Sequence, residues 1–305
     1  MKYTLESIIE RSSDSARFVA ECEREYEEKV AACADMIAAR ADAAPLILLA
    51  GPSGSGKTTT AVKLCEALRG MGRPCQVVSM DDYFRTVNPA THPRNERGQI
   101  DFESPHCVDI PLFLKHLEKL HNGKTVKVPH FDFPNQRRHA DMFTELSIGK
   151  GGLCVFEGIH ALNPMFSEGL SEWTQKVYVS ARSNIKAGND LLFKGTWVRL
   201  IRRMTRDGNF RGWVPSLTMS MWDSVRVGEK KYISPYKDLA KYQIDTHMPM
   251  EMCVFRDEAL EMLADIPRGC DRERELKSIR PALEKFPSIP RGLLSGDSLL
   301  REFLG

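Results

Sequence analysis

The sequence predicts an α/β protein in which a parallel sheet carries helices on both faces. Short apolar runs alternate along the chain with helical stretches. The first run, 46–50, ends at a glycine-rich turn that a helix follows. Continuous apolar runs of this kind are typical of parallel strands buried on both faces. With 305 residues and 42% apolar composition, the chain can build one large core.

The first expected element is a helix over residues 5–41. Apolar residues recur in it at intervals of three or four, with charged residues between them: Phe18, Cys22, Tyr26, Val30, Cys33 and Ile37. Two interpretations remain open for this helix. It packs on the edge of the main domain, or it is a dimerisation helix.

The expected sheet strands are 46–50, 76–80, 153–157 and 176–181, with helices at 58–69 and 109–121. One interval breaks the alternation, because 125–133 and 142–148 read as paired strands joined by the polar segment PNQRRHA. We expect this inserted β-hairpin to project from the fold. Residues 266–305 are rich in Pro, Gly and Arg and predict an extended tail with one or two short helices. The expected organisation is an N-terminal helical extension (1–44), a main domain (45–265) and a C-terminal extension (266–305).

Charge and cysteine content limit the partners. The formal net charge is +2, which gives no sign of a nucleic-acid-binding surface. The eight cysteines form no CxxC pair and no secretory signal precedes them, so we expect free thiols and a cytoplasmic location. The longest clearly apolar stretch, 43–50, is far too short to span a bilayer, and we expect no membrane partner.

Residues 51–58 match the phosphate-binding pattern G-x-x-x-x-G-K-[ST], and they lie between an expected strand and an expected helix. Glycines let successive N–H groups point at one phosphate, and the positive end of the following helix adds attraction. In this pattern Lys57 reaches the β- and γ-phosphates, while the Thr58 hydroxyl binds Mg²⁺. The candidate nucleotide-binding residues are Gly51, Pro52, Ser53, Gly54, Ser55, Gly56, Lys57, Thr58 and Thr59.

Two acidic strand ends supply candidate catalytic groups. Glu157 ends the strand 153–157 and is expected to hold Mg²⁺. Asp81 follows the second strand, where a carboxylate can take a proton from an attacking hydroxyl, and it is also a candidate Mg²⁺ ligand. The alternative is that Asp81 and Asp82 cap a helix that starts near Tyr83, and Asp82 fits that role better.

Arg199, Arg203 and Arg206 share one face of an expected helix. Their like charges repel one another unless anions lie opposite, and a triphosphate would supply such anions. Gly208 and Gly212 follow, as expected for a mobile lid. The alternative is a solvated basic face.

These segments, in this order, resemble the uridine kinase branch of the phosphoribulokinase/uridine kinase family, over about 46–240. The matching segments are GPSGSGKTT, SMDDYF, PRNERGQIDFESP, VPHFDF, FEGIHALNP, RLIRRMTRDGNFRG and WDSVRVGEKKYISPYKDLA. The resemblance implies a P-loop kinase fold with an inserted hairpin and a lid. It also implies ATP- and Mg²⁺-dependent transfer of a phosphoryl group to the 5′-hydroxyl of a nucleoside, with uridine or cytidine as the leading acceptor. A homo-oligomer is an open alternative.

Site roles follow from this resemblance. Asp81 is similar to the family's base, Thr58 and Glu157 to its Mg²⁺ residues, and Arg203 and Arg206 to its lid residues. The resemblance also implies a substrate site, for which we assign Phe84, Glu103, Phe131, Phe133, Gln136 and Arg199. Gln136 stands where other members carry a base-reading histidine, and the aromatic at 131 is Phe rather than a phenol. Two rival functions therefore stay open: a kinase of another small alcohol (a sugar, a sugar phosphate or a pantothenate-like compound), and a nucleotide-binding regulatory module with little turnover.

Overall fold

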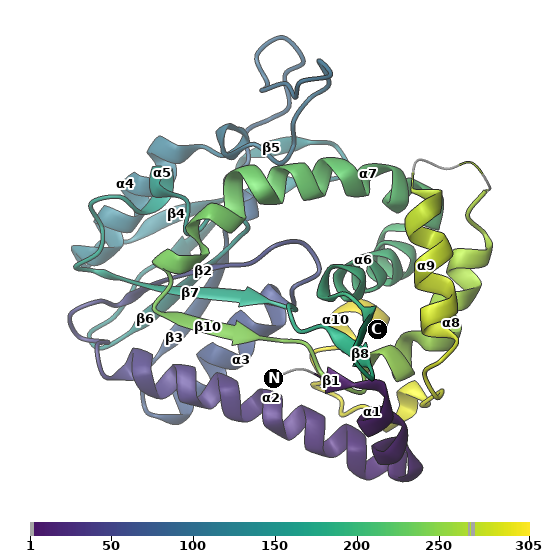
Figure 1. Ribbon diagram of the computed structural model, residues 1–305. Helices are drawn as coiled ribbons and strands as arrows, with labels where there is room; N and C mark the ends of the chain where they lie inside the picture. Colours follow the sequence, from purple (N-terminus) through teal and green to yellow (C-terminus); the bar gives the residue numbers. More distant parts are fainter. Residues whose placement is uncertain (1–2, 268, 270–271) are drawn as a thin grey trace.

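The computed structural model describes residues 3–267, 269 and 272–305. A five-stranded parallel sheet with strand order β10-β7-β2-β6-β3 forms the centre of the molecule (Figure 1). Its strands are β2 (Leu46–Ala50), β3 (Cys75–Ser79), β6 (Leu153–Glu157), β7 (Thr174–Ser180) and β10 (Tyr242–Asp245). The four predicted sheet strands are confirmed to within two residues, and β10 is an addition that the sequence did not indicate.

Alternate residues of the central strands β2 and β6 enter two different cores, which explains the continuous apolar runs of these two strands. Ile47 and Leu49 face one hydrophobic cluster, while Leu46 and Leu48 face the other. The first cluster contains apolar side chains from α2 (Ser15–Ala38), α3 (Lys57–Gly70), α6 (Gly195–Arg211), α7 (Pro215–Gly228) and α8 (Glu251–Ala264). The second contains side chains from α4 (Ile110–His121), α5 (Pro164–Ser167) and the hairpin strands β4 (Val126–Asp132) and β5 (Arg137–Leu146).

The N-terminal helix is interrupted where one continuous helix was expected. It consists of α1 (Leu5–Arg11), a 3-10 turn at Ser12–Asp14, and α2. The polar residues of the turn compete with the helix for backbone groups: Ser12 Oγ donates to the Ile8 carbonyl, and Asp14 accepts from the Arg17 N–H. All six apolar residues of the predicted stripe are buried in the first core cluster. This stripe is therefore not available as a dimer contact.

The hairpin of β4 and β5 is confirmed, but β5 begins earlier than predicted. Arg137, Arg138 and His139 belong to the strand rather than to the connecting segment. Arg138 lies opposite Phe131 in the antiparallel register. Its guanidinium donates to the carbonyls of Tyr83 and Phe84, and these contacts keep this part of the chain extended.

The described residues of 266–305 contain two helices, as predicted, but they pack against the main domain instead of forming an extended tail. They include α9 (Glu273–Leu283), a 3-10 turn (Arg291–Leu293) and α10 (Arg301–Leu304). Ile279, Leu283 and Phe286 recur at helical spacing and are buried in the first core cluster. In Figure 1, α10 lies beside α6, in the direction in which β7 and β10 point.

The remaining elements are small. β1 (Tyr3–Thr4), β8 (Ile185–Ala187) and β9 (Asp190–Phe193) form a three-stranded sheet that the sequence did not indicate. Four helical turns complete the chain: Met80–Tyr83, Pro105–Cys107, Glu229–Ile233 and Ser234–Leu239.

The seven cysteines in the described part of the chain are free and buried, as predicted, and Cys270 lies outside it. Within the same residues, no helix is both long enough and apolar enough to cross a membrane.

Candidate active site

The predicted phosphate loop connects β2 to α3, as expected. Gly54 and Gly56 have φ angles of 73° and 75°, which L side chains rarely adopt. A Cβ atom at Gly54 would lie 2.6 Å from the carbonyl oxygen of Arg199. Glycine is therefore required here both for the backbone conformation and for the close approach of α6.

The carbonyl groups of this loop are held from behind by α6 and by the residue after β10. Arg199 Nη1 donates to the Ser53 carbonyl at 3.1 Å, and Arg202 Nη1 donates to the Gly54 carbonyl at 3.3 Å. Thr246 Oγ1 donates to the Ser55 carbonyl at 2.7 Å. Because each peptide unit is planar, these bonds set the orientation of three successive peptide planes of the loop.

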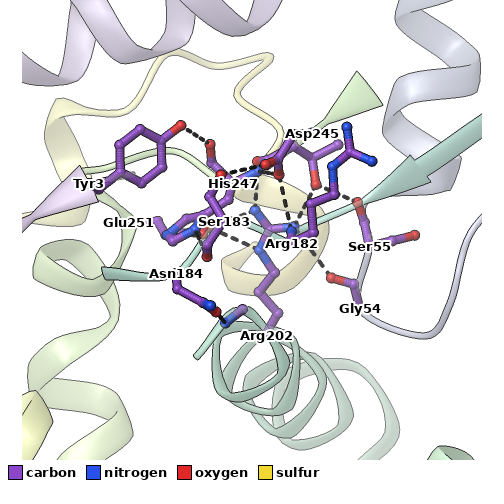
Figure 2. A network of polar contacts seen from close by, with 12 residues as sticks. Tyr3, Gly54, Ser55, Arg182, Ser183, Asn184, Arg202, Asp245, His247 and Glu251 are labelled. Atoms are coloured by element: carbon purple, nitrogen blue, oxygen red, sulfur yellow. Dashed lines mark hydrogen bonds and ion pairs between the residues drawn. The ribbon is translucent and has the colours of Figure 1, made fainter. Parts of the chain in front are cut away.

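Arg202 is the centre of a buried polar network (Figure 2). Its Nε and Nη2 donate to Glu251 Oε2 at 2.9 and 2.6 Å, and Nη2 also donates to the Thr246 carbonyl. His247 Nε2 lies 3.3 Å from Glu251 Oε1. The side chains of Arg202, His247 and Glu251 are fully buried, so the charge on Arg202 is neutralised within the protein. The network therefore connects the phosphate loop rigidly to α8.

Two of the three residues predicted to hold Mg²⁺, Thr58 and Glu157, meet at the loop. Thr58 Oγ1 donates to Glu157 Oε1 at 3.4 Å. The other carboxylate oxygen of Glu157 is buried and has no hydrogen-bond partner among the described residues. Burial is the main cause that raises the pKa of Glu157 to about 7, Lys57 opposes the shift, and Asp81 and Glu302 contribute to it.

The oxygen atoms of Thr58 and Glu157 suit a magnesium ion. The described residues contain no cluster of three or more His, Cys, Asp or Glu that could hold a metal. Mg²⁺ does not need one, since it usually takes one or two carboxylates together with waters and substrate phosphates. The Thr58 hydroxyl and the unpartnered carboxylate oxygen of Glu157 are ligands of this kind.

Asp81 lies in the turn after β3, at the carboxyl edge of the sheet. Burial raises its pKa, as does Asp82, while Lys57, Arg211 and Arg206 oppose the shift. The cap of this turn is Ser79, whose Oγ accepts from the Asp81 N–H. Capping therefore does not require either carboxylate. Asp82 instead accepts from the Phe131 N–H at 3.3 Å and attaches the hairpin to this edge.

Asp207 neutralises the lid arginines. Its carboxylate lies 3.3 Å from Arg203 Nε and 3.1 Å from both Arg206 Nη2 and Arg211 Nη1. Arg203 also donates to Ser53 Oγ at 2.9 Å. The repulsion expected along this helix face is thus relieved by a fully buried carboxylate of the same helix.

Arg199 pairs with a different carboxylate from the one that binds Arg203 and Arg206. Its Nη2 donates to both carboxylate oxygens of Glu229 at 2.9 Å, and only 3% of its side chain is exposed. Glu229 also pairs with Arg226. Arg199 therefore contacts the Ser53 carbonyl and Glu229. From the sequence, Arg199 was expected in the substrate site.

The aromatic residues predicted around the acceptor come together. The rings of Phe84, Phe131 and Phe133 form a three-membered cluster, with centroids 5.6 Å (Phe84–Phe131), 5.0 Å (Phe131–Phe133) and 6.2 Å (Phe84–Phe133) apart. Phe133 is 55% exposed, so the cluster is open on one side. Gln136 is in the hairpin turn with a φ of 50°, where its carbonyl accepts from the Val87 N–H.

Glu103 packs against the end of α7 at Gly228. A Cβ atom at Gly228 would lie 2.3 Å from the Cβ of Glu103, so α7 packs directly against it. Burial raises the pKa of Glu103 to about 7 against the opposing charges of Arg203 and Lys57, and Asp101 and Asp81 add to the shift. The charges of Arg203, Lys57 and Asp81 therefore act on the Glu103 carboxyl.

Sequence reasoning missed four residues at this site: Arg138, Asp207, Glu229 and Glu302. Arg138 secures the hairpin through the Tyr83 and Phe84 carbonyls and through Asp109 Oδ2 at 2.9 Å. Asp207 could have been found, because it stands four residues from both Arg203 and Arg211. Glu229 stands three residues after Arg226, with which it pairs, but nothing local links it to Arg199, 30 residues away. Glu302 carries no local signal, since Thr59 is 243 residues away.

A glycine-rich loop before a helix, a buried carboxylate beside its threonine and an arginine helix define a P-loop phosphotransferase. The sequence model of the Phosphoribulokinase / Uridine kinase family matches residues 46–251. The chain therefore belongs to this family.

Individual relatives agree with this assignment. The chain is 32% identical to a uridine kinase of Deinococcus deserti over 197 residues, which are 64% of this chain and 84% of that protein. It is 28% identical to a uridine kinase of Macrococcus caseolyticus over 196 residues, again 64% and 84%. Among solved structures, D-glycerate 3-kinase from Cryptococcus neoformans superimposes with a TM-score of 0.51 at 14% identity, covering 73% of this chain and 97% of that one. This last likeness concerns the fold alone.

Proposed function

We propose that this protein is an ATP-dependent kinase that phosphorylates the 5′-hydroxyl of a nucleoside, with uridine and cytidine as the leading acceptors. Membership of the family and two relatives named uridine kinase support the reaction and the acceptor. The observation that carries the proposal is the geometry at the phosphate loop, where Thr58 meets the buried Glu157 carboxylate and Arg203 donates to Ser53.

In the proposed reaction Asp81 accepts the proton of the attacking hydroxyl and orients its oxygen. Lys57, Arg203 and Arg206 neutralise charge that develops on the transferred group. Thr58 and Glu157 would hold Mg²⁺, and the bound ion would offset negative charge on the phosphates. Asp81 lies beside this pair and remains a further candidate ligand.

On the acceptor side, we propose that Phe84, Phe131 and Phe133 contact the base and that Glu103 accepts from the ribose hydroxyls. Gln136 is exposed in the hairpin turn and stays the candidate for reading the base edge. For Arg199 we propose a role different from substrate contact. It holds the Ser53 carbonyl and therefore positions the loop.

Arg206 and Arg211 are bound to Asp207 in this structure. We propose that lid closure over a triphosphate exchanges part of this pairing for contacts with phosphate oxygens. Arg206 Nε is buried and has no partner among the described residues, so it is one donor ready for such a contact. We also propose that the enzyme works in the cytoplasm and keeps the three-part organisation 1–44, 45–265 and 266–305.

The test is ADP release from ATP and Mg²⁺ across nucleosides, sugars, sugar phosphates, polyols and pantothenate. We expect stimulation by uridine or cytidine, with Asp81→Asn losing on the order of 10²- to 10⁴-fold in kcat. Asp82→Asn is the matched control, and it should raise the acceptor KM while keeping most of kcat. Stimulation by a non-nucleoside alone would overturn the acceptor. Tight ATP binding with no acceptor phosphorylated would favour the regulatory module.

A further inference from the structure

The last described residues of the chain cover the phosphate loop. A Cβ atom at Gly56 would lie 2.8 Å from Leu299 Cδ1, so the Leu299 side chain rests directly on the loop. The Phe303 carbonyl accepts from Asn209 Nδ2 of α6 at 3.2 Å. Residues 298–305 therefore contact both the phosphate loop at Gly56 and α6 at Asn209.

One carboxylate of this segment binds the helix that follows the loop. Glu302 Oε2 accepts from the Thr59 N–H at 3.1 Å and from Thr59 Oγ1 at 2.7 Å. Thr59 is the third residue of α3, and the first N–H groups of a helix have no partner within the helix. In a phosphate loop these groups and the positive helix end are what bind a nucleotide's phosphates. Glu302 thus holds donors that a phosphate oxygen would need.

The segment is well anchored on both sides of Glu302. Asp297 Oδ2 pairs with Lys63 Nζ of α3 at 2.6 Å. The Phe303 ring lies 5.2 Å from the guanidinium carbon of Arg202, at the centre of the network behind the loop. Leu299 and Leu300 are buried. A nucleotide must therefore compete with an ordered part of the fold.

We propose that residues 298–305 are an autoinhibitory segment, in which the Glu302 carboxylate occupies the phosphate-binding groups of Thr59 until a nucleotide displaces it. The inference rests on the proposed function, in that the loop binds a nucleoside triphosphate. Two anions cannot share the same pair of donors. Only molecules with an open segment can bind a nucleotide. The apparent affinity is therefore the intrinsic affinity multiplied by the fraction of molecules in which the segment is open. The segment lies beyond the residues that the family model matches, so the device is a property of this chain's own extension.

The first test is the Kd of ADP, which carries the phosphates and permits no turnover, measured by titration calorimetry on the full chain. We expect Glu302→Ala to bind ADP on the order of tenfold more tightly than the wild type, and Glu302→Gln to lie between them. The matched control Glu284→Gln removes an exposed carboxylate of the same extension and should leave the Kd unchanged. Equal or weaker binding by Glu302→Ala, with its melting temperature retained, would overturn the proposal.

The second test asks whether ADP opens the segment of the wild-type chain. Trypsin cleavage after Arg301, followed by intact mass, should become faster when ADP is added, and unchanged or slower cleavage would count against opening. Lys57→Ala separates the two proposals. One outcome would overturn only the inhibitory segment: the wild type binds ADP, Lys57→Ala does not bind it, and Glu302→Ala binds it no more tightly than the wild type. If no variant binds ADP, both proposals fail.

Discussion

The hydroxyl of Thr58 donates to the carboxylate of Glu157 at 3.4 Å, across the gap between the phosphate loop and the next strand of the sheet. The two residues are 99 positions apart in the sequence and reach one another because β2 and β6 are neighbours in the sheet. This pair places the proposed magnesium site at the carboxyl edge of the sheet, beside Asp81.

Glu157→Gln should therefore change the response to magnesium more than nucleotide binding as such. We expect kcat to fall on the order of 10²-fold and the Mg²⁺ concentration for half-maximal rate to rise, because a neutral amide is a weaker ligand. Steady-state rates across an Mg²⁺ titration measure both effects. Glu168→Gln, at an exposed carboxylate, is the control. An unchanged Mg²⁺ dependence would remove Glu157 from the metal site.

The hairpin offers a pair of neighbouring arginines that differ in one respect. Arg138 is bound to two carbonyls and to Asp109, whereas the Arg137 side chain is 62% exposed. Arg138→Ala should raise the acceptor KM roughly tenfold and leave the Kd of ADP unchanged, because it loosens only the acceptor side. Arg137→Ala should behave as the wild type. Similar KM values for both variants would show that the hairpin does not depend on the Arg138 anchor.

Stability should decrease with pH through the titration of Glu103. Its pKa is about 7 in the folded protein and about 4.5 in the unfolded chain. Between these values the folded state binds more protons, so the free energy of unfolding falls as the pH rises from about 4.5 to 7. The loss is complete above the folded pKa.

Glu103→Gln should remove this part of the pH dependence. Urea unfolding at pH 5 and pH 8 measures it, and we expect the wild type to lose more stability than the variant, by up to about 3 kcal/mol. Parallel losses in the two proteins would mean that the Glu103 carboxyl titrates as an ordinary surface acid.

The Arg202–Glu251 pair should be sensitive to the removal of either partner. Glu251→Gln leaves a fully buried guanidinium without a counter-charge, and we expect a loss of about 3–5 kcal/mol in the free energy of unfolding. The exposed pair Arg280–Glu284 is the comparison. Glu284→Gln should cost less than about 1 kcal/mol. Chemical denaturation of both variants decides, and equal losses would contradict the structural importance of the network.

Much of the fold could be predicted because it is encoded in contiguous residues. The strand, the loop and the helix of residues 46–70 follow from an apolar run, a glycine pattern and helical periodicity. The errors lie where a distant contact overrides local preference. Arg138 is extended because Tyr83 and Phe84 hold its side chain. The segment after 266 folds because Ile279, Leu283 and Phe286 find a core to enter.

The candidate site likewise has residues that the sequence predicted and residues that only the structure revealed. The sequence by itself determined the P-loop, its lysine and threonine, the acidic ends of two strands and the arginine-rich helix, because backbone geometry and residue chemistry are local properties. Only the tertiary structure decided which anion faces each cation and which group covers the loop. Glu229 for Arg199 and Glu302 at Thr59 are packing outcomes, since these partners lie on elements that come together only in space. Asp207 differs, because it lies on the same helix as the lid arginines, four residues from Arg203 and from Arg211.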